Sequence, residues 1–276
     1  MPSQRGSEII QTETRTGGVA MIGVFDSGLG GLSVLTEIRR AMTSVDLIYL
    51  ADRARAPYGP RTLDEVREIS HEIAGWLVES AVETIVIACN TASAAALDSL
   101  RVDFADVSFV GMEPAVKPAA ISTESGVIGV LATEATFQGR LFRSVVSRHA
   151  GASRVIERAC PSWVDLVERG LVDGTQVERA VREGVEPLLD EGADALVIGC
   201  THFSFLKPVI TRVTGGAIRL IDPAPAVAAQ TARVSRHQGE SGRLTLVASG
   251  DTEEFAGLAW SVAGVKTSRP VLPFPS

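Results

Sequence analysis

The chain has 276 residues, a length that predicts one or two domains. Hydrophobic residues make up 45% and charged residues 21%, a globular composition that excludes collagen, a coiled coil or disorder over most of the length. The net charge of -7 at pH 7 argues against nucleic-acid binding, and no apolar run approaches the roughly 18–20 residues that span a bilayer. The three cysteines are an odd number, which favours reduced thiols in the cytoplasm over a disulfide framework.

Residues 1–20 are polar, lack helical or strand periodicity and lack the apolar core of a signal peptide, so we expect a mobile extension there. From Met21 onward, short apolar runs alternate with amphipathic stretches. The apolar runs predict buried parallel strands at residues 22–25, 47–50, 84–88, 108–110, 127–131, 195–198, 218–221 and 244–248. The amphipathic stretches predict helices at residues 62–80, 137–149, 175–191 and 224–236.

Alternating strands and helices predict the α/β class, with mainly parallel sheets covered by helices on both faces. The number of predicted strands is large for a single open sheet, which favours two domains. An internal similarity supports two related halves: residues 84–91 (TIVIACNT) resemble residues 195–202 (ALVIGCTH). In both segments an apolar strand leads to a cysteine and then into a predicted helix. Ligands of open α/β sheets bind beyond the carboxyl ends of the strands, where Cys89 and Cys200 are expected to lie.

The two cysteines are the first candidates for chemistry, although most cysteines are simply small buried hydrophobic residues. A helix N-terminus stabilises a thiolate by only about 0.3–1 kcal/mol, so each thiol also needs a neighbouring base. His202 lies two residues after Cys200, and Asp26 ends the first predicted strand, along the sheet edge expected for Cys89. Two thiols with separate helpers favour a catalytic interpretation. Cys160 has no such equivalent and is interpreted as structural.

A glycine-rich turn follows the first predicted strand at residues 25–31 (FDSGLGG). Its spacing matches neither a dinucleotide-binding nor a phosphate-binding loop. We expect Gly30 and Gly31 to provide positive φ angles and close packing in a tight turn.

Two other segments leave both a structural and a binding interpretation open. The turn Pro57-Tyr58-Gly59 is either an ordered loop whose amides hold a carboxylate or a plain surface turn. Thr133 and Thr136 follow a predicted strand, where they either cap a helix or bind an anion.

Cofactor chemistry finds little support in the sequence. None of the lysines follows a predicted strand, so a Schiff-base lysine for pyridoxal phosphate is poorly placed; these are Lys117, Lys207 and Lys266. The histidines lack metal-binding spacing; these are His71, His149, His202 and His237. We therefore expect neither a cofactor nor a metal.

Taken in chain order, several motifs together resemble those of the glutamate racemases, within the cofactor-independent aspartate/glutamate racemase superfamily. They are residues 22–31 (IGVFDSGLGG), 54–59 (ARAPYG), 88–93 (ACNTAS), 132–136 (ATEAT), 159–168 (ACPSWVDLVE) and 199–202 (GCTH). Arg53, and Phe203 with Ser204, depart from the usual residues of that family at the expected rim of the site.

The resemblance implies that Cys89 and Cys200 are acid/base thiols on opposite faces of the substrate Cα. It implies that Asp26 and His202 activate them and that Glu168 lies near the second thiol. The residues it implies for substrate binding are Asp26, Ser27, Tyr58, Gly59, Asn90, Thr91, Thr133, Thr136, Thr201 and His202. It also implies two pseudo-symmetric, doubly wound domains with the site in the cleft between them. Residues 21–115, completed by 223–276, would form the first domain, and residues 116–222 the second.

The chemistry of the residues agrees with this resemblance, because moving a proton from one face of Cα to the other needs one charged and one neutral group. The implied function is cofactor-independent interconversion of L- and D-glutamate, which supplies D-glutamate for peptidoglycan. Three alternatives stay open: an aspartate racemase, a cysteine hydrolase, and a regulatory protein that binds DNA gyrase as some glutamate racemases do. The expected partner is a small molecule, with no nucleic acid or membrane, and the family makes a homodimer an expectation.

Overall fold

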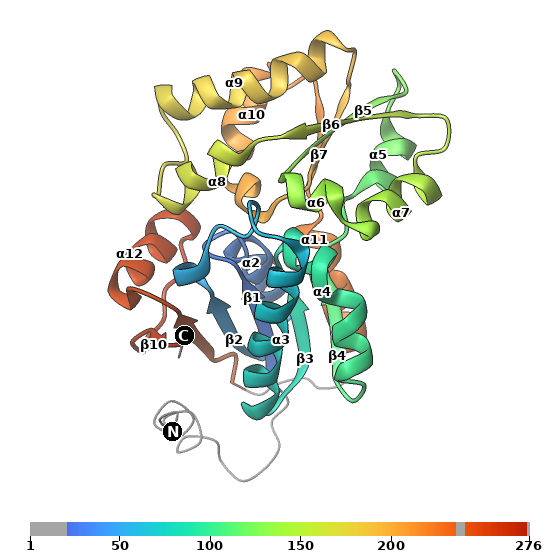
Figure 1. Ribbon diagram of the computed structural model, residues 1–276. Coiled ribbons are helices and arrows are strands. Elements are labelled where there is room, and N and C mark those ends of the chain that lie inside the picture. Colours follow the sequence, from blue (N-terminus) through green and yellow to red (C-terminus); the bar gives the residue numbers. More distant parts are fainter. Residues whose placement is uncertain (1–20, 236–240, 275–276) are drawn as a thin grey trace.

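The computed structural model describes residues 21–235 and 241–274, and its strands form two separate parallel sheets (Figure 1). The extension expected at residues 1–20 lies outside the described residues. The first sheet has the order β10-β9-β2-β1-β3-β4 within that part of the chain. Its strands are β1 (Met21–Asp26), β2 (Asp46–Ala51), β3 (Val82–Ile87), β4 (Ser108–Gly111), β9 (Leu244–Ala248) and β10 (Leu272–Pro273). The second sheet has the order β6-β5-β7-β8, with β5 (Val127–Ala132), β6 (Arg154–Ala159), β7 (Ala195–Ile198) and β8 (Arg219–Ile221).

The two sheets share one strand order. Four strands of the first sheet run β2-β1-β3-β4, and those of the second run β6-β5-β7-β8, so the third strand of each half lies beside the first. Every pairing is parallel, which confirms the predicted α/β class. The order reverses between the first and third strands of each half, and such a switch point is where open α/β sheets bind ligands. Cys89 follows β3 and Cys200 follows β7, so the thiols occupy equivalent positions.

Helices cover both faces of each sheet. The first sheet packs against α2 (Leu32–Ala41), α11 (Ala224–Val234) and α12 (Thr252–Ala263) on one face, and against α3 (Leu63–Glu79) and α4 (Asn90–Asp103) on the other. The second sheet packs against α8 (Pro161–Glu168), α9 (Thr175–Asp190) and α10 (Lys207–Val213) on one face. Its other face carries α5 (Val116–Ser122) and α7 (Arg140–His149). The chain therefore returns to the first sheet through α11, β9, α12 and β10 (Figure 1).

Strand β2 shows why its sequence reads as one continuous apolar run. Leu47 and Tyr49 pack into the core on the α2 side, whereas Ile48 and Leu50 pack into the core on the α3 side. Successive side chains of a strand point to opposite faces, so a strand covered on both faces has a nearly continuous apolar run, here from Leu47 to Ala51. None of the helices in the described residues is both long and apolar enough to cross a membrane.

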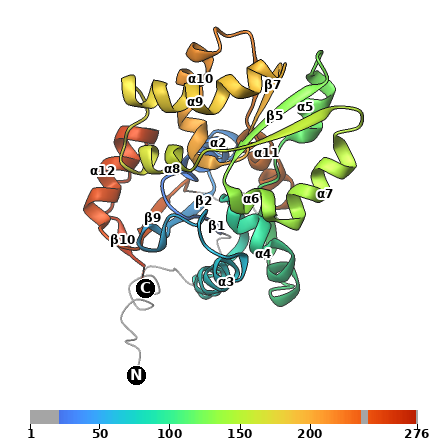
Figure 2. The ribbon, with the colours of Figure 1, turned by 45° about the horizontal axis from the view of Figure 1, so that its top comes forward.

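The single helix predicted over residues 137–149 is wrong. The chain instead forms a short helix α6 (Glu134–Gln138), breaks at Gly139 and continues as α7. A Cβ on Gly139 would lie 2.7 Å from Ala94 Cβ of α4, so the break brings the chain close against that helix. Figure 2 shows α6 and α7 next to α4.

Two strands were not predicted. The edge strand β6 carries Arg154, Glu157 and Arg158 and is partly exposed, so it lacks an apolar run. The strand β10 has only two residues. The expected positive φ angles at Gly30 and Gly31 are also wrong, because Gly31 has a φ of -65° and Gly30 is not among the described glycines with positive φ.

Candidate active site

A cavity of about 280 Å³ opens at the carboxyl ends of the strands, lined by residues from the loops of both sheets. Ten of the residues expected at the site line it: Ser27, Tyr58, Gly59, Cys89, Asn90, Thr91, Thr133, Cys200, Thr201 and His202. Three other expected residues, Asp26, Thr136 and Glu168, lie behind this lining and contact it through hydrogen bonds. The lining also includes Pro57, Pro60, Glu134, Pro161, Val164 and Asp165.

Cys89 is the N-cap residue of α4, as the sequence predicts. Its Sγ accepts a hydrogen bond from the Ala92 amide at 3.5 Å and lies 3.8 Å from Ser27 Oγ. Burial raises the pKa of Cys89 to about 12, and the negative charge of Asp26 adds to the increase. The neutral thiol is therefore the favoured form of Cys89.

Asp26 does not form a hydrogen bond with Cys89 in the structure. Its Oδ1 accepts from the Gly28 amide at 2.8 Å, and its Oδ2 accepts from the Thr201 hydroxyl at 3.1 Å. Burial raises the pKa of Asp26 above its usual value of 3.8. Asp26, at the end of β1, thus holds the loop that follows β7 and carries Cys200.

Cys200, His202 and Glu168 form a linked set that comes from the half of the molecule built on the second sheet. Cys200 Sγ lies 3.7 Å from His202 Nδ1, and His202 Nε2 lies 2.6 Å from Glu168 Oε1. Burial opposes the charge of His202, but the hydrogen bonds to Cys200 and Glu168 raise its pKa well above the usual 6.5. Burial likewise opposes the charge of Glu168, but the hydrogen bond from His202 lowers its pKa below 4.5. The set therefore favours a charged imidazolium–carboxylate pair beside the Cys200 sulfur.

The helix expected directly after Cys200 is a 3₁₀ helix, η2 (Thr201–Leu206), and the Cys200 side chain does not cap it. Electrostatic help from an α-helix N-terminus therefore reaches Cys89 but not Cys200. His202 supplies the neighbouring group that the Cys200 sulfur needs.

Asn90, Thr91 and Thr133 add polar side chains to the cavity lining, and Thr136 lies behind them. Both polar atoms of the Asn90 side-chain amide are buried without a hydrogen-bond partner among the described residues. Thr91 Oγ1 lies 2.9 Å from Thr133 Oγ1, which lies 3.0 Å from Thr136 Oγ1. Thr133 also caps α6, which confirms the capping role, and it lines the cavity as well. Anion binding by this hydroxyl stays a prediction. Buried unpaired amide groups are costly, which marks Asn90 as a group aimed at a ligand.

Tyr58 is one of the residues that line the cavity. Its hydroxyl donates to Asp52 Oδ2 at 2.5 Å, and Asp52 Oδ1 accepts from the Ser249 hydroxyl at 2.8 Å. Gly59 brings this loop close to the second half, since a Cβ there would lie 3.3 Å from the Thr133 side chain. Tyr58 is thus buried within an ordered turn, whereas its neighbour Pro57 is exposed.

Val164 and Asp165 were missed as lining residues. They lie four and three residues before Glu168 on α8, so the helical period places them on the Glu168 face of that helix. Cys160 is buried against Trp163 in the core and does not line the cavity. Within residues 21–235 and 241–274, no cluster of three or more His, Cys, Asp or Glu side chains is arranged to hold a metal ion.

Comparison with known proteins agrees with this geometry. Residues 22–231 match the model of the Asp/Glu/Hydantoin racemase family. A glutamate racemase of Roseiflexus sp. is 48% identical over 86% of this chain and 90% of its own. The Escherichia coli glutamate racemase, solved with L-glutamate and the activator UDP-MurNAc-ala, has a TM-score of 0.82 at 29% identity, covering 93% of this chain and 98% of its own.

The Francisella tularensis glutamate racemase, solved with D-glutamate, has a TM-score of 0.78 at 26% identity and covers 94% of this chain and 98% of its own. Its structure and that of the Escherichia coli protein show the same fold with opposite enantiomers bound. The chain belongs to the Asp/Glu/Hydantoin racemase family and is an amino-acid racemase, an isomerase.

Proposed function

We propose that the enzyme interconverts L- and D-glutamate with Cys89 and Cys200 as its two acid/base groups. The observation that carries this proposal is the position of the two sulfurs, which line one cavity from equivalent points of two matching sheets. Opposed groups of this kind suit a reaction that removes a proton from one face of Cα and returns one to the other face.

The surroundings of each thiol support a division of tasks. From L-glutamate, the Cys200 thiolate takes the Cα proton while the Cys89 thiol donates its proton to the opposite face. Cys200 then carries a proton and Cys89 is the thiolate, so the next D-glutamate reacts in reverse. His202 beside Cys200 stabilises that thiolate, and the raised pKa of Cys89 suits a thiol that waits as the proton donor.

The substrate assignment is supported by relatives named glutamate racemase and by neighbours solved with L- and D-glutamate. Asn90, Ser27, Thr91 and Thr201 supply neutral donors and acceptors for an amine and carboxylates. Asn90 supports this best, because its amide has no competing partner among the described residues.

We extend the proposal to the domain boundaries, location and partners of the enzyme. Residues 21–115 with 223–276 would form one domain and residues 116–222 the other, with the cavity between them. The free thiols suit a reducing cytoplasm, where D-glutamate would enter peptidoglycan synthesis. A homodimer and a contact with DNA gyrase stay predictions of the family resemblance.

The experiment uses L- and D-glutamate analogues that carry chlorine on Cβ. Removal of the Cα proton expels chloride and forms a carbon–carbon double bond, so elimination needs one thiol and racemisation needs two. By family resemblance, Cys200 faces the proton of the L-enantiomer and Cys89 that of the D-enantiomer. Cys89→Ala should therefore eliminate chloride only from the L-analogue, and Cys200→Ala only from the D-analogue. Both variants should lose glutamate racemisation by about 10²–10⁴-fold.

Elimination from both enantiomers by either variant would refute the two-thiol reaction. Faster racemisation of aspartate than of glutamate by the unmodified enzyme would refute the substrate assignment instead. Amide or ester hydrolysis that survives Cys200→Ala would favour the hydrolase alternative.

A further inference from the structure

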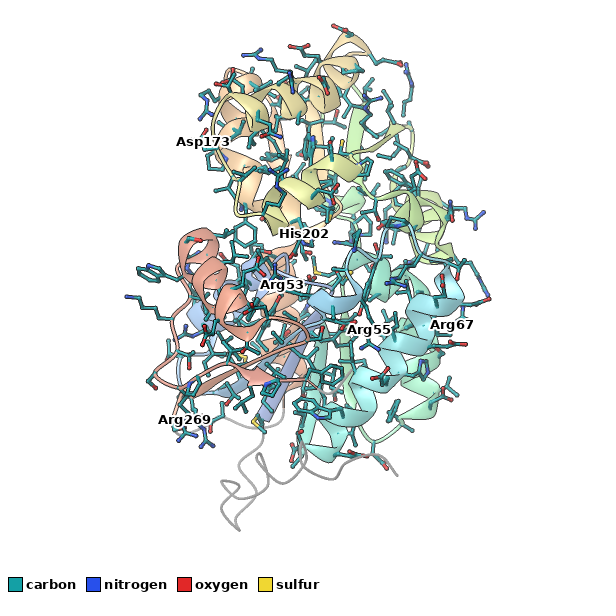
Figure 3. All side chains as sticks on the ribbon, turned by 60° about the vertical axis from the view of Figure 1, so that its left-hand side comes forward. Arg53, Arg55, Arg67, Asp173, His202 and Arg269 are labelled. Atoms are coloured by element: carbon teal, nitrogen blue, oxygen red, sulfur yellow. The ribbon has the colours of Figure 1, made fainter. Side chains whose placement is uncertain are left out.

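Arg53 lies behind the Cys200 side of the cavity and belongs to the other half of the molecule. It opens the 3₁₀ helix η1 (Arg53–Arg55), which follows β2 of the first sheet. Its Nε lies 3.3 Å from Glu168 Oε2, at the end of α8 in the second half. Its Nη1 and Nη2 lie 3.3 and 3.4 Å from the carboxylate oxygens of Glu254 on α12. Figure 3 shows Arg53 and His202 close to the junction between the two halves.

The two oxygens of Glu168 have separate partners. Oε1 accepts from His202 Nε2 and from the Leu29 amide, each at 2.6 Å. Oε2 faces Arg53. Among the described residues, Arg53 is the only one that forms a hydrogen bond or ion pair with this oxygen. The carboxylate plane is therefore fixed from both sides, and through it the orientation of the His202 ring.

The charges alternate along this chain of contacts. Glu254 is negative, Arg53 positive, Glu168 negative and His202 the proton carrier beside Cys200. The side chains of Arg53 and Glu168 are only 14% and 16% exposed, whereas Glu254 is 58% exposed. Solvent therefore screens the Arg53–Glu168 pair less than the Arg53–Glu254 pair.

We propose that Arg53 is a positioning residue for the Cys200 half-reaction: it holds Glu168 and offsets part of its charge, so that His202 can both give a proton to Cys200 and take one from it. A lone carboxylate at 2.6 Å would hold the imidazolium proton more tightly, because nothing would share its negative charge. This inference rests on the proposed two-thiol reaction and assigns one further residue to it.

The sign of the effect follows from the groups around His202. Cys200 and Glu168 contact the ring directly, the Asp26 carboxylate acts on it through charge, and Arg53 lies behind Glu168. Removing the positive charge of Arg53 favours the imidazolium and raises the pKa of His202. Removing the negative charge of Glu254 leaves the charge of Arg53 less neutralised, and this lowers the pKa of His202.

The first test measures the two half-reactions separately, with the β-chloro analogues. In the Cys89→Ala background, Arg53→Gln should slow elimination from the L-analogue by about tenfold or more, because His202 loses its alignment with Cys200. In the Cys200→Ala background, it should slow elimination from the D-analogue by less than about twofold. Arg53→Lys should restore part of the loss, and Arg40→Gln, which removes an exposed ion pair on α2, is the matched control.

The second test follows the His202 ring by NMR, with its signal assigned from its absence in His202→Asn. The midpoint of protonation should move to higher pH in Arg53→Gln and to lower pH in Glu254→Gln. Equal slowing of both half-reactions, or the same midpoint in both variants, would overturn the role of Arg53. If the single-thiol backgrounds themselves fail to discriminate the enantiomers, the two-thiol reaction falls instead, and the NMR midpoints still decide whether Arg53 acts on His202.

Discussion

Glu168 Oε1 lies 2.6 Å from His202 Nε2, in a pair whose side chains are only 16% and 4% exposed. Burial disfavours the charge on both side chains, but the contact outweighs this effect. The pKa of His202 is therefore raised and that of Glu168 is lowered. Both shifts favour the charged pair, so the contact links catalysis on the Cys200 side to the stability of the fold.

Replacing Glu168 by Gln should change the pH dependence of stability. The contribution of His202, whose folded pKa is raised, is fully present below its usual value of 6.5 and is lost as the pH rises through the folded value. The contribution of Glu168, whose folded pKa is lowered, is present above its usual 4.5 and is lost as the pH falls through the folded value. Glu168→Gln should therefore lower the free energy of unfolding most between these two pH values, by about 1–3 kcal/mol.

Urea unfolding of both proteins from acid to alkaline pH measures this difference. It should shrink at each end of the range. Glu37→Gln, which removes the partner of the exposed Arg40, should change stability little at any pH. A deficit in Glu168→Gln that does not vary with pH would contradict the charged pair.

Asn90→Ala should weaken substrate binding without destabilising the protein. The amide has no described partner, so its removal loses only contacts made to the substrate. A hydrogen bond to a charged group contributes about 1.5–3 kcal/mol, which corresponds to a rise in KM of about 10–100-fold. The melting temperature should stay the same or rise, because an unpaired buried amide is destabilising.

Ser93 on the same helix is the matched control for Asn90. Its buried hydroxyl donates to the Ile87 carbonyl and accepts from the Met112 amide. Ser93→Ala should therefore lower the melting temperature and leave KM unchanged. The Asn90 assignment would be wrong if both variants showed the same pattern.

Gly30→Ala should damage the site through close contact alone. A Cβ at Gly30 would lie 2.4 Å from Thr201 Oγ1 and 2.6 Å from His202 Nδ1. Both groups would have to move, and we expect kcat to fall by about 100-fold. A Cβ at Gly75 in α3 would meet nothing within 4 Å, so Gly75→Ala should keep full activity and stabilise the helix by about 0.5–1 kcal/mol. Steady-state kinetics and thermal melts of the pair distinguish the two effects, and a Gly30→Ala enzyme with normal kcat would refute the contact argument.

Cys89 should react slowly with iodoacetamide in the ligand-free enzyme. With a pKa of about 12, its thiolate fraction at pH 8 is about 10³-fold below that of an ordinary thiol. Mass spectrometry of the peptide that contains Cys89 should show slow labelling that accelerates as the pH is raised. The same cysteine in urea-unfolded protein should react at an ordinary rate, and rapid labelling of the folded enzyme at neutral pH would contradict the favoured neutral thiol.

The sequence predicts most of the strands and the positions of both thiols because buried strands appear as short apolar runs. Strand β2 is apolar from Leu47 to Ala51, and the repeated strand–cysteine segment places Cys89 and Cys200 at equivalent sheet edges. The charged edge strand β6 has no such apolar run, since its side chains are partly exposed. The break at Gly139 depends on its contact with Ala94, which periodicity within the segment does not reveal.

Contacts between the halves were the least predictable part of the site. Arg53 and Glu168 are far apart in the sequence, and neither belongs to a local pattern that points to the other. The same holds for Thr201 and Asp26, which meet only because the two sheets face each other across the cavity. Local patterns identify which residues carry reactive groups, whereas pairing across the junction depends on the folded arrangement.

The two halves share a strand order but surround their thiols differently: Cys89 caps an α-helix, and Cys200 faces a histidine. Mirror-image amino acids have equal free energies in water, so the equilibrium constant of a racemisation is unity. The ratio kcat/KM must then be the same for both enantiomers at every pH, however unlike the two thiols are. The difference between the two thiols can therefore appear only as values of kcat and KM that differ between the enantiomers by the same factor. One enantiomer can then saturate the enzyme at a lower concentration, although neither is favoured at equilibrium.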